Sequence, residues 1–314
     1  MNQRILITPK SFTKYKAVPV QMLEDAGYDI EFNETGHTLS AEELIERASN
    51  GVVGIIVGVD PISQAVVDAC ADLRAVSKYG VGMDNIDLPA CKAKGIAVDN
   101  ARGTNSISVA ELAVGLMFEG ARRMSEHIRV VRNGGWGRTM GAELTGKRVG
   151  IVGGGQIGRA VAERCVGLAM DVQVYDPFLP DDASIRAIGA TCTEDLDALF
   201  SESDVVSLHL PVTDETRHLV NAERLATMKP TAILINTARG ELVDEDALHC
   251  ALREGALGFA GQDVFSQEPP SADHPLLQLP NFVLTPHLGA FTGEAVERMA
   301  VTSTENLLRM LRER

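Results

Sequence analysis

A glycine-rich turn between a strand and a helix constrains the fold of this chain more than any other feature. Arg148 to Val152 is a short apolar run typical of a strand, and Gly153-Gly154-Gly155-Gln156-Ile157-Gly158 follows it directly. Beyond the turn, Ala160, Val161 and Cys165 recur at helical spacing. This order is typical of a parallel α/β sheet, in which the turn glycines let the backbone approach a pyrophosphate at a helix N-terminus.

An acidic residue stands where the next strand ends. Val172 to Tyr175 forms that strand, and Asp176 follows it, eighteen positions after Gly158. A carboxylate at this place in a dinucleotide-binding unit bonds the adenine ribose and repels a 2′-phosphate, and no neighbouring arginine offers to receive one. The sequence therefore predicts NAD rather than NADP. The alternative interpretation of the glycines is a tight turn that serves only steric needs.

Length, charge and cysteine content limit the class of protein. A length of 314 residues suggests about two domains, and the 45% apolar content is enough for a sizeable core. The formal net charge is −14 and no long Lys/Arg-rich run is present, which argues against nucleic acid as a partner. The N-terminus has no long apolar stretch, so we expect a cytoplasmic protein without membrane contact. The five cysteines form no C-x-x-C pair and are expected to be small core residues, not disulfides or zinc ligands.

Alternating strands and helices predict a parallel, doubly wound sheet in the first hundred residues. Ser40 and Glu43 form a capping box at the start of one of the helices. The expected strands are Arg4–Thr8, Tyr28–Phe32, Gly54–Gly58, Ala75–Tyr79 and Ile96–Asp99.

A long amphipathic segment, Ser106 to Met124, is interpreted as an interdomain helix. The glycine-rich stretch Asn133 to Gly137 carries the only tryptophan, Trp136. Because an indole is costly to leave in water, Trp136 is expected to pack either against another subunit or against its own domain.

A second set of strands ends in loops with polar or glycine-containing sequences. In open parallel sheets ligands bind beyond the carboxyl ends of the strands, so these loops are expected to converge on one cleft. The final segment, Gly293 to Leu311, is expected to form a helix without a following strand. The expected strands are Val205–Leu208, Ala232–Asn236, Gly258–Asp263 and Phe282–Leu284.

Three ionisable residues, Arg239, Glu268 and His287, fall in these loops. Hydride transfer to a 2-keto acid needs a cation to hold the carboxylate and polarise the carbonyl, which suits arginine, and an acid to protonate the developing alkoxide, which suits histidine. Glu268 is the candidate carboxylate beside the histidine. Taken singly, residues of these types in loops are more often surface or ion-pair residues than catalytic ones.

Four motifs taken together resemble the D-isomer-specific 2-hydroxyacid dehydrogenases, and the match is closest to the phosphoglycerate dehydrogenase branch. The motifs are the glycine turn with Asp176, Asn236-Thr237-Ala238-Arg239-Gly240, Asp263-Val264-Phe265-x-x-Glu268-Pro269, and Thr285-Pro286-His287-Leu288-Gly289.

The resemblance implies a role for each matching residue. Arg239 would bind the substrate, His287 would donate and accept the proton, and Glu268 would hold the imidazole. The segment from Lys78 to Asn85 resembles the substrate loop, in which the N–H groups of Val81 and Gly82 would receive the carboxylate. Lys78 could supply one positive charge toward a phosphate. The residues expected around the cofactor are Gly153, Gly155, Gln156, Ile157, Gly158, Asp176, Leu210, Thr237, Ala238, Asp263, His287 and Gly289.

The family resemblance also implies a fold of two doubly wound α/β domains. A Rossmann NAD-binding domain, residues 101–285, would be inserted into a flavodoxin-like substrate-binding domain formed by residues 1–100 and 286–314. Closure of the domains would exclude water during hydride transfer, and members are usually homodimers.

The implied activity is NAD-dependent interconversion of a small (R)-2-hydroxy acid and its 2-keto acid, with 3-phosphoglycerate as one candidate. One departure concerns the phosphate, because Gly58-Val59-Asp60 stands where phosphoglycerate dehydrogenases typically place an arginine, and an acid there would repel the phosphate. The alternatives are a formate- or phosphite-type dehydrogenase, against which Glu268 argues, and a non-catalytic dinucleotide-sensing co-repressor. Turnover on a panel of keto acids would discriminate between an enzyme and a sensor.

Overall fold

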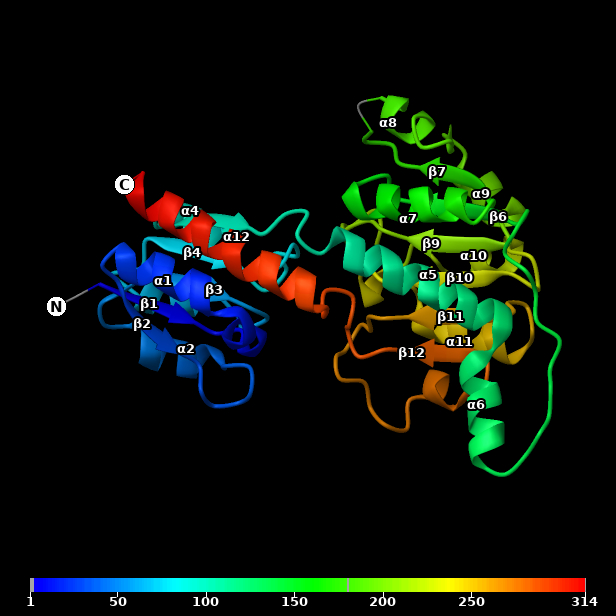
Figure 1. Ribbon diagram of the computed structural model, residues 1–314, viewed down its shortest axis with the longest axis horizontal. Coiled ribbons are helices and arrows are strands. Elements are labelled where there is room, and N and C mark those ends of the chain that lie inside the picture. The colour runs from blue at the N-terminus through cyan, green and yellow to red at the C-terminus, as the bar shows by residue number, and fades with distance from the viewer. Residues whose placement is uncertain (1–2, 180, 314) are drawn as a thin grey trace. The chain divides into compact units, whose positions relative to one another are not determined.

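The computed structural model describes residues 3–179 and 181–313, and the chain divides into two compact units. The split unit comprises the residues up to Asn105 and those from Ala290 onward, and the inserted unit comprises Ser106–Gly289. The divisions proposed from the sequence, after residues 100 and 285, fall a few residues earlier. Each unit is built on its own parallel sheet, which confirms the predicted fold class (Figure 1).

The split unit contains a five-stranded sheet in the order β2-β1-β3-β4-β5. Neighbouring strands pair in parallel throughout, so every strand ends at the same edge of the sheet. The strands are β1 (Arg4–Ile7), β2 (Asp29–Phe32), β3 (Val52–Val57), β4 (Ala75–Lys78) and β5 (Ala97–Asn100).

Two apolar layers cover the faces of this sheet because successive strand side chains point to opposite faces. In β1, Ile5 and Ile7 enter the layer beneath α1 and α12, whereas Leu6 enters the layer on the other face. Ser40 and Glu43 form the predicted capping box at the start of α2. The helices are η1 (Lys10–Tyr15), α1 (Ala17–Asp25), α2 (Ala41–Ala48), α3 (Gln64–Ala69), α4 (Leu88–Ala93) and α12 (Gly293–Arg312).

The inserted unit contains a seven-stranded sheet in the order β12-β11-β10-β9-β6-β7-β8, again with parallel pairing. The order reverses at β6, the strand that leads into the glycine turn. In open α/β sheets this reversal is where ligands bind. The strands are β6 (Arg148–Val152), β7 (Asp171–Tyr175), β8 (Thr191–Thr193), β9 (Val205–Leu208), β10 (Ile233–Asn236), β11 (Phe259–Gln262) and β12 (Phe282–Leu284).

Helices pack on both faces of this sheet. Val149 and Ile151 of β6 enter the apolar cluster shared with α5 and α7, and Val152 enters the cluster on the opposite face. The helices are α5 (Ser106–Arg122), α6 (Met124–Arg132), α7 (Gln156–Gly167), α8 (Ala183–Arg186), α9 (Leu196–Glu202), α10 (Ala222–Thr227), η2 (Gly240–Leu242), α11 (Glu245–Arg253) and η3 (Pro275–Gln278).

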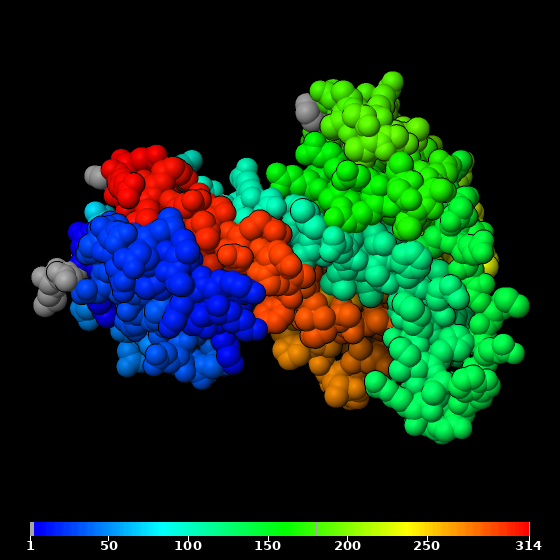
Figure 2. All heavy atoms as spheres, in the orientation of Figure 1, coloured from blue at the N-terminus to red at the C-terminus, as the bar shows by residue number. Residues whose placement is uncertain are grey.

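A sharp bend separates α5 from α6. Arg123 adopts a left-handed conformation with φ 48°, and the buried Glu119 carboxylate accepts hydrogen bonds from the Ser125 N–H. Figure 1 shows α6 and the segment after it standing away from the sheet of their unit, and in Figure 2 the corresponding green spheres project at its margin. Trp136 is 84% exposed, so the expectation that it packs against its own domain is wrong.

Three further expectations need correction. The three-residue edge strand β8 was missed, because Thr191-Cys192-Thr193 is too short and polar to show an alternating pattern. Cys250 is exposed and Cys192 is half-buried, although Cys70, Cys91 and Cys165 are buried as expected. Asp60, interpreted as an acid that would repel a phosphate, is only 2% exposed, and its carboxylate accepts hydrogen bonds from Thr8 and Leu39.

Within residues 3–179 and 181–313, no helix is both long and apolar enough to cross a bilayer.

Candidate active site

The glycine turn after β6 is fixed by close backbone contacts. Gly153 has φ +103°, and a Cβ atom there would lie 2.4 Å from the His209 carbonyl oxygen. At Gly158 a Cβ would lie 1.9 Å from the Gly153 carbonyl oxygen, so both positions require glycine. By contrast, a Cβ at Gly155 would meet no atom of the described residues within 4 Å. The N-terminus of the twelve-residue helix α7 is therefore open to a ligand beside Gly155, Gln156 and Ile157.

Asp176 lies at the end of β7 and contacts the turn directly. Its carboxylate accepts hydrogen bonds from the Gly154 N–H at 2.8 Å and the Phe178 N–H at 2.9 Å. A carboxylate has about four lone-pair sites, so these two bonds leave capacity for ribose hydroxyls. The side chain is half-buried at the edge of the sheet where the glycine turn lies.

The loop after β9 supports the turn from the neighbouring strand. The His209 N–H donates to the Val152 carbonyl at 2.7 Å, and its ring Nε2 lies 2.8 Å from the Ser207 hydroxyl. Burial lowers the pKa of His209 to about 3, so the ring is neutral at physiological pH. The backbone nitrogen of Leu210 lies 3.2 Å from the position of a Gly153 Cβ, which places Leu210 against the glycine turn.

Arg239 lies in a turn that the buried Asn236 holds together at the end of β10. The Asn236 amide donates to the Arg239 carbonyl at 2.7 Å and accepts from the Ala238 N–H at 3.0 Å. The half-buried guanidinium donates to the Ala238 carbonyl at 2.7 Å. The preceding residue, Thr237, is buried, and its hydroxyl oxygen has no hydrogen-bond partner among the described residues.

Gly240 brings this turn against the loop that follows β11. A Cβ at Gly240 would lie 2.0 Å from the Phe265 carbonyl carbon and 2.2 Å from the Ser266 nitrogen. The two backbones are therefore in contact. Since Glu268 belongs to the second loop, the close approach at Gly240 sets the separation between Arg239 and Glu268.

Glu268 and His287 form an ion pair. Glu268 Oε2 lies 2.8 Å from His287 Nδ1, and Oε1 accepts a hydrogen bond from the Phe265 N–H at 2.9 Å. The bond to Glu268 and its negative charge raise the pKa of His287 above its ordinary value, although burial opposes the shift. Burial raises the pKa of Glu268, but the bonds from His287 and Phe265 outweigh it and leave that pKa below its usual range.

The charge of Arg239 acts on both members of this pair and lowers both pKa values. The structure therefore brings the three predicted catalytic residues into one site within the inserted unit. The imidazole side chain is 51% exposed. With Nδ1 engaged by the glutamate, Nε2 is the nitrogen that can exchange a proton with a ligand.

The buried Asp263 carboxylate holds the segment that carries His287. Successive N–H groups of His287, Leu288 and Gly289 donate to Asp263, the first to its carbonyl at 2.9 Å and the others to its two carboxylate oxygens at 2.7 Å. The Thr285 hydroxyl also donates to this carboxylate. Burial raises the pKa of Asp263, and these hydrogen bonds oppose the rise. The bonds hold His287 in a left-handed conformation, φ 52°, that a non-glycine residue seldom adopts.

Gly289 is fixed from a second side by the start of α5. The buried Ser108 hydroxyl donates to the Gly289 carbonyl at 2.6 Å, and a Cβ at Gly289 would lie 3.2 Å from a Val109 methyl. The segment after β12 is thus held by α5 as well as by Asp263.

The predicted substrate-loop residues belong to the split unit. Gly80 has φ +132°, and the half-buried Val81 accepts a hydrogen bond on its carbonyl from the Asn100 amide at 2.6 Å. Gly82 is also half-buried. Lys78 is only 7% exposed, and its ammonium donates to the Gly58 carbonyl and to Asn85.

The inserted unit also matches a known protein family. Residues 114–289, more than half of the chain, match the family described as D-isomer specific 2-hydroxyacid dehydrogenase, NAD binding domain. The chain belongs to this family.

Individual family members match over most of the chain. This chain is 39% identical to a D-3-phosphoglycerate dehydrogenase of Methanocaldococcus jannaschii, and the match covers 93% of this chain and 55% of that relative. It is 38% identical to a hydroxypyruvate reductase of Thermotoga maritima, and that match covers 90% of this chain and 92% of the relative. It thus spans about half the length of the first of these relatives. A crystal structure of a protein from Thermus thermophilus superposes with TM-score 0.89 at 39% identity, covering 99% of this chain and 98% of that one.

Several residues that build this site were assigned no role from the sequence. Asn236 and Thr285 stand in the recognised motifs, and each could have been noticed as a polar residue that ends or follows an otherwise apolar strand. Ser108 gave no such signal, because a serine in the first turn of a helix is common. Its partner, the Gly289 carbonyl, lies far away in the sequence.

We predict that Glu268→Gln lowers the pKa of His287, because the substitution removes the negative charge that favours the imidazolium form. Less of the ring is then protonated at neutral pH. The measurement is the NMR titration of the His287 ring protons in both proteins. Glu43→Gln, which removes the same charge in the split unit, is the control and should leave the His287 titration unchanged. An unchanged His287 titration in Glu268→Gln would contradict the cause assigned to the shift.

Proposed function

We propose that this protein is an NAD-dependent oxidoreductase that interconverts a small (R)-2-hydroxy acid and its 2-keto acid. The observation that carries the proposal is the His287–Glu268 pair within the electrostatic reach of Arg239, at the strand ends of a dinucleotide-type sheet. Its membership of the 2-hydroxyacid dehydrogenase family supports the same reaction class.

The residues at the glycine turn fit a dinucleotide. The open space at Gly155 and the helix N-terminus suit a pyrophosphate, and Asp176 suits a ribose. At the other end of the cofactor, the buried Thr237 hydroxyl, which has no partner among residues 3–179 and 181–313, would be satisfied by a polar group such as a carboxamide. When bound, the nicotinamide supplies or receives the hydride.

The chain's own residues would bind the acid and move the proton. Arg239 holds the carboxylate and draws electron density from the carbonyl oxygen, which lowers the cost of the charge that develops there. In the reductive direction, protonated His287 donates from Nε2 to that oxygen, and Glu268 stabilises the imidazolium until then. In the oxidative direction, neutral His287 accepts the hydroxyl proton.

We infer a preference for NAD over NADP from Asp176. The carboxylate accepts from ribose hydroxyls but repels a 2′-phosphate. Phe178, two residues later, is 91% exposed and supplies no compensating charge.

The proposed substrates are small 2-hydroxy and 2-keto acids, and 3-phosphoglycerate remains one candidate. A phosphoglycerate dehydrogenase and a hydroxypyruvate reductase are similar to this chain at nearly equal identity, so their names do not select between a phosphorylated and a simple acid. At Gly58 the chain offers no side chain to grip a phosphate.

We also propose that the exposed apolar residues of α6 and the segment after it pack against a second copy of the chain. Met124, Ile128 and Val131 recur at helical spacing, and each is at least 44% exposed. Trp136 and Met140 extend the patch at 84% and 95% exposure. Apolar side chains gathered on one stretch in this way are typical of a subunit interface.

We predict steady-state turnover with NADH and at least one of hydroxypyruvate, glyoxylate and 3-phosphohydroxypyruvate. His287→Ala should lower turnover about a hundredfold or more, because the proton donor is lost, with little change in NADH affinity. His249→Ala, in α11 and outside the assigned site residues, is the control and should remain active. Absence of turnover on the whole panel would favour a sensor, and near-normal activity of His287→Ala would remove its assigned role.

We predict that Asp176→Ala lowers the ratio of kcat/KM with NADH to kcat/KM with NADPH, because the repulsion of a 2′-phosphate is lost. Asp171→Ala, at the start of the same strand, removes the same charge and should leave the ratio unchanged. A ratio equal to that of the wild-type protein would refute the ribose assignment.

We predict that the wild-type protein sediments as a dimer at micromolar concentration and that Ile128→Asp sediments as a monomer, because a charge in an apolar interface is costly. Val18→Asp, at a 60% exposed position of α1, is the matched control and should stay dimeric. A monomeric wild-type protein, or a dimeric Ile128→Asp variant, would count against this interface.

A further inference from the structure

The loop that follows β4, residues 79–85, is fastened at both ends to the loop that follows β3, residues 58–62. Lys78 and Asn85 make the contacts, and both loops lie at the same edge of the split-unit sheet because β3 and β4 pair in parallel. The 79–85 loop contains Val81 and Gly82, the residues predicted to bind the substrate carboxylate.

Lys78 is buried, and its ammonium is engaged within its own unit. Nζ donates to Asn85 Oδ1 at 2.6 Å and also to the Gly58 carbonyl. The side chain thus closes the loop by joining its first residues to its last. At least two of the three N–H donors of the ammonium are therefore used within the split unit.

Asn85 connects Lys78 to the 58–62 loop. Its Nδ2 donates to the Asp60 carbonyl at 2.6 Å and to the Gly58 carbonyl at 3.1 Å. The Asn85 carbonyl accepts from the Ile62 N–H at 2.8 Å. One amide side chain therefore accepts from Lys78 and donates to two carbonyls of the 58–62 loop.

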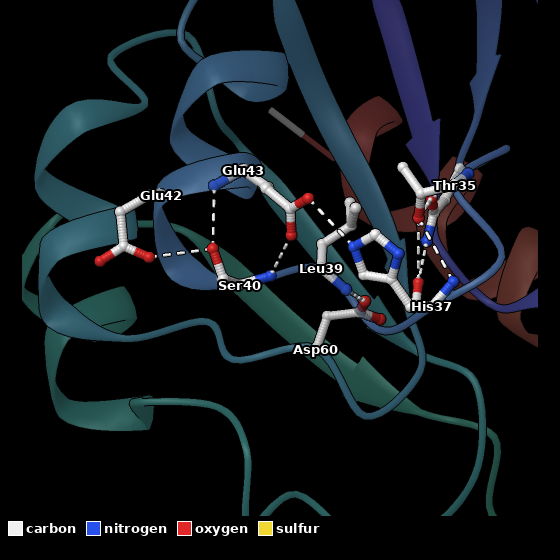
Figure 3. A network of polar contacts seen from close by, with 8 residues as sticks. Thr35, His37, Leu39, Ser40, Glu42, Glu43 and Asp60 are labelled. Carbon is white, nitrogen blue, oxygen red and sulfur yellow. Dashed lines mark hydrogen bonds and ion pairs between the residues drawn. The ribbon is translucent and has the colours of Figure 1, made fainter.

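The 58–62 loop is itself anchored by Asp60. Figure 3 shows the Asp60 carboxylate directed at the Leu39 N–H, a hydrogen bond of 2.7 Å, and the other carboxylate oxygen accepts from the Thr8 hydroxyl. The Thr8 hydroxyl in turn accepts from the Gly58 N–H at 3.1 Å. The contacts run from the end of β1 and the segment before α2, through Asp60 and Asn85, to Lys78.

We propose that Lys78 is a positioning residue that acts through Asn85, and that the pair orders the 79–85 loop for binding the substrate carboxylate. This inference rests on the proposed function, since it assigns the loop to the same keto acid. The loop needs such support because Gly80 and Gly82 leave its backbone free to adopt many conformations. Ordering it before binding removes an entropic cost that the substrate would otherwise meet.

A double-mutant cycle tests whether Lys78 acts through Asn85. Lys78→Met and Asn85→Leu keep the length or volume of each side chain and remove its hydrogen bonds. We expect each single variant to raise KM for the keto acid about tenfold, with kcat and KM for NADH little changed. The double variant should also show about a tenfold increase, because the second substitution removes a contact already lost. A hundredfold increase would show independent action and overturn the proposal.

Lys92→Met, at an exposed position of α4, is the control for loss of one positive charge from the same unit. It should leave KM unchanged. An increase equal to that of Lys78→Met would indicate a long-range effect of net charge and would also overturn the proposal.

Hydrogen exchange provides a readout that does not depend on turnover. In the absence of substrate, Lys78→Met and Asn85→Leu should accelerate amide exchange in residues 80–84 while the amides of β1, β3 and β4 keep their protection. That pattern shows a folded unit with a loosened loop. Unchanged exchange in the loop, or a general loss of protection, would contradict local positioning. If the wild-type protein turns over none of the keto acids, the proposed function fails, and the exchange experiment still decides whether Lys78 and Asn85 order the loop.

Discussion

The buried carboxylate of Asp263 is the interaction on which the candidate site depends. It is attached to one strand end and receives hydrogen bonds from the segment that follows the neighbouring strand. A buried carboxylate without hydrogen-bond partners would be costly. The N–H groups of Leu288 and Gly289 that satisfy it also hold the neighbouring His287 in its left-handed conformation. The parallel sheet makes this possible, because adjacent strands end side by side.

Much of this arrangement could be predicted from the sequence, because it depends on local patterns. The strand before the glycine turn shows as an apolar run, the capping box at Ser40 needs residues only three positions apart, and Asp176 follows its strand directly. Arg239 and His287 were recognisable because strand ends in a parallel sheet gather at one edge. Secondary-structure period and strand direction together predict which residues meet.

The remaining features depend on contacts between residues distant in the sequence. Asp60 was interpreted as an acid that would repel a phosphate, since nothing near it in the sequence indicates that Thr8 and Leu39 would enclose its carboxylate. The start of α6 was hidden because the bend at Arg123 is stabilised by the side chain of Glu119 and not by a glycine or proline. Asn85 stands in a recognised motif, but which carbonyls it binds follows only from the path of the 58–62 loop.

The contact at Gly240 has a consequence for how such a site can change over time. The turn bearing the guanidinium touches the main chain of the loop bearing the glutamate, with no side chain between them. A substitution that enlarges position 240 would therefore displace both functional groups together.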